Sequence, residues 1–351
     1  MKKPDIIPLI TKILISLGSI LLFIFLRGPA LAKITTPGLD NKLLKQKNAH
    51  PSPSRLDQAR EHFKKGVQYS QAQRVDLAIQ EYRKTLEFDP NFVMAHVNLG
   101  MSYLQQQEVE AAIQELKKAI QKDPKLKLAR FDLWWAYRQQ GKYDEGIAEL
   151  KAVIALDPNN VNAYLNLGDS YLADKKMLPE AIQAYLEALA RGRQTALIHQ
   201  KIGKAYELSG QVDKAIEQFQ RAISVDKNNL YTYLFLYVCL EKSKKKLEAA
   251  EALRNGLSAF RKEPRLADSS YQDIAHIMEC LLGTYPEKDL MSIKNPIITC
   301  QLHYYLGMYY LFQNKRKEAA QHLQQAIDTK INTISEYEYA KIELERIKGQ
   351  K

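Results

Sequence analysis

Residues 93–126 read VMAHVNLGMSYLQQQEVEAAIQELKKAIQKDPKL, and this stretch decides the fold because its pattern recurs along the 351-residue chain. Its glycine is Gly100, and equivalent glycines are Gly66, Gly168, Gly203 and Gly307. Each is followed three residues later by a tyrosine, and nine residues further on comes a small residue, alanine in most copies, with a one-residue insertion before Ala181. A pattern that returns every 34 or 35 residues is typical of stacked helix pairs.

Each recurring position has a mechanical reason. The glycine allows the first helix of a pair to approach the second closely, and the apolar residues recur at helical spacing and fill the space between them. Pro90, Pro124 and Pro158 end the second helix, because proline cannot continue its hydrogen-bond ladder. We therefore predict an all-α fold: a right-handed α-solenoid of helix–turn–helix repeats with a C-terminal capping helix.

The same positions set the domain boundaries. Regular copies cover 59–92, 93–126, 127–160, 161–195 and 196–229, a weaker copy covers 230–264, and the repeats together occupy residues 55–264. Residues 265–299 do not align and are predicted to be a degenerate helical repeat. Residues 300–351 hold the final copy and a helix that opens with the capping-box pattern Ser335-x-x-Glu338. This last helix is expected to cover the exposed end of the solenoid.

The N-terminus is predicted to direct export. Residues 1–32 combine a basic start, an apolar run over 13–26 and Ala30-Leu31-Ala32, which together are typical of a signal peptide cleaved after Ala32. The alternative is an uncleaved membrane anchor over residues 6–26, with the rest of the chain still outside the cytoplasm. Residues 33–54 are polar and are interrupted by Pro37, Gly38, Pro51 and Pro53, and we predict a disordered linker there.

Composition argues against several classes of function. The net charge is +11, but residues 1–54 carry +6 of it, so the repeats lack the concentrated basic stripe of a nucleic-acid-binding protein. The three cysteines lack metal-ligand spacing and are expected to be buried, although an exported chain could pair two of them. No catalytic triad, phosphate loop or metal motif is present, so we expect no enzymatic activity, no cofactor and no metal.

Two groups of basic residues are predicted to be structural. His62, His96, His199 and His303 share the fourth position of their repeats, where a side chain normally packs between the two helices. The run from Lys242 to Lys246 falls at a turn, and we interpret it as solvated. Contact with an acidic partner or a lipid headgroup is the alternative for this run.

The first helices of the repeats supply a candidate binding groove. Asn98, Asp132 and Asn166 lie one repeat apart, and such a ladder of short polar groups can hydrogen-bond the backbone of an extended peptide. The predicted peptide-binding groove comprises Asn98, Met101, Phe131, Asp132, Trp135, Asn166 and Asp169. Trp135 is the preferred exposed anchor, because tryptophan is enriched in binding hot spots. The alternative is that these residues only pack against neighbouring helices.

The repeats resemble the tetratricopeptide family over about residues 59–333. The resemblance implies an adaptor or scaffold with a protein or peptide partner. Some family members hold an acidic C-terminal peptide with a clamp of lysine and asparagine. Phe63, Val67 and Leu128 stand where that clamp needs such residues, and only Asn98 matches.

Residues 230–347 are similar to a narrower group, the periplasmic tetratricopeptide adaptor lipoproteins that present murein hydrolases to a protease. The similarity lies in residues 304–311 and 336–340, and it implies an envelope adaptor that can form a homodimer. Our leading hypothesis is an exported, non-catalytic adaptor of the periplasm or an equivalent compartment. The alternative is a membrane-anchored assembly factor for a membrane complex, associated with the membrane through its N-terminus.

Overall fold

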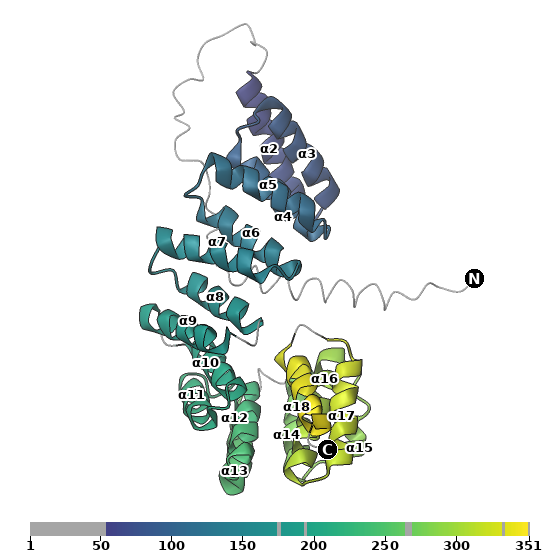
Figure 1. The fold of residues 1–351 in the computed structure, drawn as a ribbon. Coiled ribbons are helices and arrows are strands. Elements are labelled where there is room, and N and C mark those ends of the chain that lie inside the picture. Colours follow the sequence, from purple (N-terminus) through teal and green to yellow (C-terminus); the bar gives the residue numbers. More distant parts are fainter. Residues whose placement is uncertain (1–53, 174–176, 193–194, 264–268, 332–333, 350–351) are drawn as a thin grey trace, which may run out of the picture. The chain divides into compact units, whose positions relative to one another are not determined.

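The structure is a computed structural model, and it describes residues 54–173, 177–192, 195–263, 269–331 and 334–349. The chain divides into two compact units, Met1–Pro53 and Ser54–Lys351. The predicted signal peptide and nearly all of the predicted linker therefore lie outside the described residues. Within the described ranges all regular structure is helical, and the predicted all-α fold is confirmed (Figure 1).

Six consecutive helix pairs form the first part of this unit. Each pair joins a first and a second helix by a short turn, and each second helix packs on the first helix of the next pair. The pairs are α2 (Arg55–Gln71) with α3 (Val75–Phe88), α4 (Val93–Gln105) with α5 (Val109–Lys122), α6 (Lys127–Gln139) with α7 (Tyr143–Leu156), α8 (Val161–Ala173) with α9 (Leu178–Arg191), α10 (Ala196–Leu208) with α11 (Val212–Val225), and α12 (Leu230–Lys242) with α13 (Lys246–Arg261).

The recurring small residues set the distance between paired helices. A Cβ atom added at Gly168 would lie 2.4 Å from Cε1 of Tyr185, a fully buried ring on the second helix of the same pair. Ala78, Ala112 and Ala215 on the second helices have no exposed surface. Small residues at these positions therefore permit the close helix packing that the repeat pattern predicted.

The third repeat exchanges the sizes of two packing residues. Trp134 occupies the position of the usual glycine and is 6% exposed. Facing it, Gly146 replaces the usual alanine, and a Cβ there would lie 3.1 Å from Cδ1 of Trp134. The indole Nε1 donates a hydrogen bond of 2.8 Å to Oγ of Ser170 on α8. The large side chain is thus accommodated by a smaller one on the facing helix.

The seventh repeat lacks a full second helix. Its first helix is α14 (Ser269–Leu281), and the only helix before the next repeat is the four-residue α15 (Glu287–Leu290). The eighth repeat, α16 (Pro296–Phe312) with α17 (Arg316–Asp328), consequently packs directly on α14, and α16 also contacts α12. One continuous core of buried residues joins the helices from α11 to the C-terminal helix.

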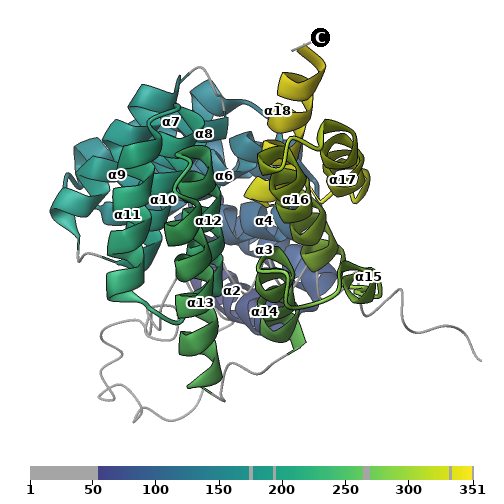
Figure 2. The ribbon, with the colours of Figure 1, turned by 90° about the horizontal axis from the view of Figure 1, so that it is seen from below.

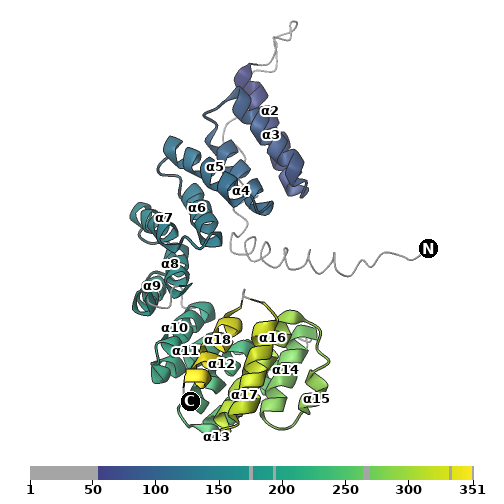
Figure 3. The same cartoon turned by 45° about the vertical axis from the view of Figure 1, so that its right-hand side comes forward.

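The C-terminal helix, α18 (Ser335–Gly349), has two sets of neighbours. It packs on α17 and α16 as the predicted capping helix (Figure 2). Two hydrogen bonds also link it to the first helices of earlier repeats, since Lys204 of α10 bonds to Ser335 and Lys242 of α12 bonds to Glu343. Figure 3 shows the ribbons of α10, α12 and α18. These contacts span 131 and 101 residues of sequence, and the repeat pattern did not predict them.

Two further features of the described residues are the state of the cysteines and the hydropathy of the helices. Cys239, Cys280 and Cys300 are buried and free, as their expected role in the core requires. None of the described helices is both long enough and apolar enough to cross a bilayer.

A candidate protein-binding face on the first helices

We use the term helix-A face for the surface formed by the first helices α4, α6, α8, α10 and α12. It carries all seven residues of the predicted groove. Asn98 and Met101 lie on α4, Phe131, Asp132 and Trp135 on α6, and Asn166 and Asp169 on α8. Six of them are half-buried, whereas Asp132 has no exposed surface.

The burial of Asp132 interrupts the predicted polar ladder. Asn98 remains partly accessible, and its Nδ2 donates a 3.4 Å hydrogen bond to the Tyr82 hydroxyl. Burial raises the pKa of Tyr82 to about 12, so this hydroxyl stays protonated. An extended peptide would therefore reach Asn98 and Asn166, but not the carboxylate between them. The role of the ladder in peptide binding stays a prediction.

Asp169 is the centre of a charged cluster on α8. Its Oδ1 accepts hydrogen bonds of 2.6 Å from the Tyr185 hydroxyl and 2.6 Å from Nζ of Lys201. Burial alone would raise the pKa of Asp169, but the charge of Lys201 and these two hydrogen bonds outweigh it, and the pKa lies below its usual range. The side chain keeps 24% of its surface exposed, so this ionised carboxylate is part of the accessible face.

Trp135 and Arg138 form the neighbouring part of the face on α6. The guanidinium of Arg138 lies 5.4 Å from the centre of the Trp135 ring, which is within the range of a cation–π interaction. Arg138 also contributes electrostatically to lowering the pKa of Asp169. An aromatic ring and a cation are thus held side by side at the half-buried position predicted for an anchor residue.

Lys204 extends the cationic character along α10. Its Nζ lies 4.0 Å from the centre of the Phe235 ring and donates a 3.0 Å hydrogen bond to Oγ of Ser335 in α18. Burial lowers the pKa of Lys204, and this exceeds the opposing effect of the Glu336 carboxylate. Arg138, Lys201 and Lys204 therefore follow one another across α6 and α10, with Asp169 between them.

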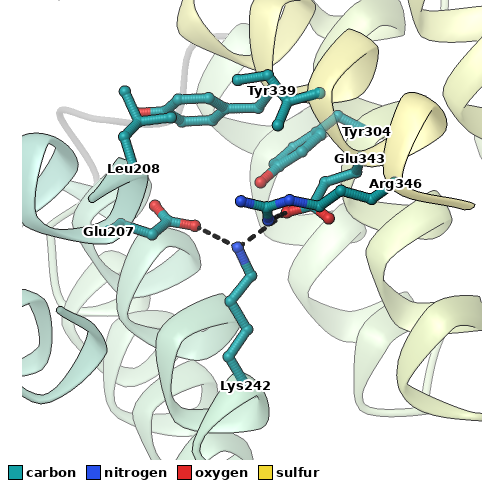
Figure 4. Close-up of a pocket in the computed structure, with 8 residues that line it drawn as sticks. Glu207, Leu208, Lys242, Tyr304, Tyr339, Glu343 and Arg346 are labelled. Atoms are coloured by element: carbon teal, nitrogen blue, oxygen red, sulfur yellow. Dashed lines mark hydrogen bonds and ion pairs between the residues drawn. The ribbon is translucent and has the colours of Figure 1, made fainter. Parts of the chain in front are cut away.

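Next to Lys204 lies the site where α18 meets α10, α12 and α16, which we call the seat of α18; its lining includes Glu207, Lys242, Tyr304, Tyr339 and Glu343. Nζ of Lys242 lies 3.0 Å from Oε1 of Glu207 and 3.1 Å from Oε1 of Glu343 (Figure 4). Arg346 also pairs with Glu343, at 2.8 Å. Burial would lower the pKa of Lys242, but the two carboxylates raise it above its usual range. Our interpretation of Lys242 as part of a solvated turn is wrong, because its long stem carries the ammonium to a carboxylate 101 residues away.

The two segments that resemble envelope adaptors meet in this seat. The rings of Tyr304 and Tyr339 have centroids 5.9 Å apart. Glu336 is 2% exposed and accepts hydrogen bonds from the Tyr305 hydroxyl, at 3.3 Å, and from Gln301, at 3.4 Å. These tyrosines and acidic residues therefore hold α18 against α16, which gives their sequence pattern a packing role in this chain.

The fourth-position residues form a separate, internal series. In five repeats this residue meets one 19 positions later on the second helix of the same repeat: His62–Glu81, His96–Glu115, Arg130–Glu149, His199–Gln218 and His303–His322. Three of the histidines, His96, His199 and His303, are less than 9% exposed. The predicted packing of this position between paired helices is confirmed, and the residues belong to the interior rather than to the helix-A face.

The described residues offer little to a metal or cofactor. Across the described ranges, no group of three or more His, Cys, Asp or Glu side chains is arranged to hold a metal ion. A pocket of about 210 Å³ lies between α12, α14 and α16, with walls that include Tyr237, Leu281 and Phe312. Its lining is largely apolar, and it is separate from the residues of the predicted groove.

Family models match four separate parts of the chain. Models described as tetratricopeptide repeat match residues 63–126 and 196–229, and one described as TPR repeat matches residues 136–175. A fourth, described as Integrator complex subunit 8, TPR repeats, matches residues 287–351. The chain is a tetratricopeptide-repeat protein. No curated protein sequence matches this TPR protein.

Solved structures share the fold. A tetratricopeptide repeat protein from Parabacteroides merdae matches 83% of this TPR protein and 98% of its own chain, with 14% identity and a TM-score of 0.57. The C-terminal part of a TPR repeat-containing protein from Cytophaga hutchinsonii matches 79% and 98%, with 14% identity and a TM-score of 0.53. A crystal structure of MamA is 30% identical over 46% of this TPR protein and 94% of its own chain, with a TM-score of 0.44.

Repeats of this kind indicate a protein that binds other proteins, and the fold is typically non-catalytic. The helix-A face is consistent with that class, because its accessible polar groups are ion pairs beside aromatic rings. The identity of the partner, the homodimer and the export of this TPR protein stay predictions.

Proposed function

We propose that this TPR protein is an exported, non-catalytic adaptor that holds a partner protein on the helix-A face of α4, α6 and α8. The observation that carries the proposal is the cluster of Trp135, Arg138, Asp169 and Lys201. It combines an aromatic ring with accessible charges, which is the composition that binding hot spots favour. The basic start, apolar run and Ala-x-Ala site in residues 1–32 support export.

The experiment compares partner capture by matched variants. The full chain and the variant Trp135→Ala/Arg138→Ala are expressed in the native cell, and bound proteins are recovered after in-cell cross-linking. The control is Lys341→Ala/Tyr337→Ala on α18, which removes a cation–aromatic pair outside α4, α6 and α8, with Nζ of Lys341 5.4 Å from the ring centre of Tyr337. We expect the first variant alone to lose its partner. Equal capture by wild type and both variants would contradict a partner site on this face.

The second candidate function is a membrane-anchored assembly factor, which the apolar run over residues 13–26 favours. N-terminal sequencing combined with fractionation separates the two candidates. A soluble chain that begins at Lys33 supports the free adaptor of the periplasm or an equivalent compartment. A chain in the membrane fraction that retains its first residues supports the anchored factor.

A further inference from the structure

The pocket of about 210 Å³ beside α12 is lined by three consecutive repeats. Its walls come from α12 and α13 of the sixth repeat, the end of α14 in the seventh and the end of α16 in the eighth. In a regular solenoid a repeat contacts only its neighbours, so the sixth and eighth repeats would not share a wall. Here the second helix of the seventh repeat is reduced to the four residues of α15, and α16 reaches α12. The pocket therefore belongs to an irregular part of this chain, apart from the residues of the predicted groove.

Three aromatic rings line this pocket. The rings of Tyr237 on α12 and Phe312 on α16 have centroids 6.4 Å apart and lie nearly perpendicular to each other, at 78°. Tyr309, one turn before Phe312, adds the third ring. The face of an aromatic ring carries partial negative charge and attracts cations. A cavity of about 150 Å³ can hold one benzene ring, so this pocket has room for a compact apolar body.

Glu241 adds a carboxylate that is only partly satisfied. Within the described part of the chain, its Oε2 is buried and accepts no hydrogen bond. Burial raises the pKa of Glu241, and the opposing charge of Lys246 does not cancel this effect. Lys246 also lines the pocket, but it is exposed and acts on Glu241 through its charge, without a hydrogen bond. Because the terminal torsion of a glutamate side chain is broad, either oxygen can turn towards a donor in the pocket.

We propose that this pocket binds a small protonated amine with a compact apolar body. The ammonium donates a hydrogen bond to the carboxylate of Glu241, and the apolar body lies against the rings of Tyr237 and Phe312. A neutral ligand of the same shape would leave the carboxylate without a counter-ion, and an anionic ligand would be repelled by it. Water screens the exposed Lys246 more than it screens the half-buried Glu241, so the attraction of the carboxylate prevails. This site is independent of the proposed partner surface on α4, α6 and α8.

The test compares two ligands of similar shape in titrations of the full chain, followed through the NMR signals of the ligand. Benzylamine is protonated at pH 7, and benzyl alcohol is its neutral counterpart. We expect wild type to bind benzylamine about 10-fold more tightly than benzyl alcohol, which corresponds to one charge-assisted hydrogen bond.

Matched variants locate this selectivity. Glu241→Gln keeps the shape of the side chain and removes its charge, so it should bind both ligands with nearly equal affinity. The control Glu248→Gln removes an exposed carboxylate on α13 that does not line the pocket, and it should keep the wild-type preference. Lys246→Gln should bind benzylamine about 2- to 3-fold more tightly and benzyl alcohol as wild type does, because it removes a like charge. A gain of this kind cannot arise from a loss of structure.

A third ligand separates a free amine from a lysine side chain of a protein. Nα-acetyl-lysine methylamide carries its ammonium on a narrow chain, so it should bind about 3-fold more weakly than benzylamine, because it covers less of the aromatic surface. Binding of this mimic as tight as that of benzylamine would overturn the free amine and assign the pocket to a protein side chain. The preference for an amine is overturned if wild type binds benzylamine no better than benzyl alcohol, or if Glu241→Gln retains the preference.

Discussion

Replacement of Lys242 by Met tests whether one buried cation holds α18 in its seat. Methionine retains most of the apolar stem of lysine and removes the ammonium that lies 3.0 Å from Glu207 and 3.1 Å from Glu343. The two carboxylate side chains are only 5% and 11% exposed. The variant therefore leaves two nearly buried negative charges close to each other without their shared counter-ion.

The expected loss follows from the exposure of the three groups. Removing one partner of a fully buried ion pair costs about 3–5 kcal/mol. Here Lys242 keeps 21% of its side chain exposed, and Arg346 still pairs with Glu343, so we expect about 2–3 kcal/mol.

Urea denaturation measures the free energy of unfolding, and hydrogen exchange of residues 335–349 measures the opening of α18. A local loss of about 2.7 kcal/mol corresponds to roughly 100-fold faster exchange in this helix. Lys242→Met/Glu343→Gln should recover about half of the loss, since it removes one of the unpaired charges. The control is Lys341→Met, because the pair of Lys341 with Glu338 has both side chains 42% exposed. We expect the control to change stability by less than about 0.5 kcal/mol.

The reasoning would be refuted by a Lys242→Met variant that loses less than about 0.5 kcal/mol and shows wild-type exchange in α18. Failure of Glu343→Gln to recover any stability in the double variant would also refute it, because the loss would then come from altered packing rather than from unpaired charge.

Three further predictions concern the interior. Burial, reinforced by the charge of His322, lowers the pKa of His303 from 6.5 to about 4. As the pH falls, the unfolded chain therefore binds a proton before the folded chain does, and the free energy of unfolding should fall by about 2 kcal/mol from pH 7.5 to pH 5 in urea titrations. The variant His303→Gln should reduce this dependence on pH. Gly168→Ala should lose about 1–3 kcal/mol because its Cβ would lie 2.4 Å from Tyr185, whereas Gly349→Ala, with nothing within 4 Å, should lose none in thermal melts. Trp134→Phe removes the hydrogen bond to Ser170 and should lower the free energy of unfolding by about 1–2 kcal/mol. Adding Ser170→Ala should restore part of this loss. Equal stability of wild type and Trp134→Phe would show that the bond contributes nothing.

The repeat architecture could be predicted because its determinants are local. Gly100 and Leu116 lie within one repeat, and a Cβ at the glycine would lie 2.8 Å from Cγ of the leucine. The same relation between a glycine and a large residue on the second helix holds at Gly66, Gly168, Gly203 and Gly307, so the spacing alone predicts the helix pairs there. The exchange of Trp134 and Gly146 was also visible in the sequence, since both depart from the pattern in the same repeat and in opposite directions.

The candidate site was less predictable because position in a repeat does not determine accessibility. Asn98, Asp132 and Asn166 occupy equivalent positions, yet only Asp132 is completely buried. Arg138, six residues after Asp132 on the same helix α6, was not among the predicted residues, although it lies over the Trp135 ring. A ladder of equivalent positions shows which helix faces a groove, but the bulk of adjacent side chains decides which members of the ladder a ligand can reach.

The seat of α18 could not be predicted because it depends on a defect in the solenoid. A regular repeat interacts only with its neighbours, and its stability is then a sum of local terms. In the seventh repeat the second helix is reduced to the four residues of α15, so α16 packs on α14 and reaches α12. Lys204 and Lys242 of the fifth and sixth repeats then bond to α18 at the other end of the array. Such bonds couple repeats that are not neighbours, so the fifth repeat and α18 should lose their structure together, whereas the first two repeats remain free to open independently.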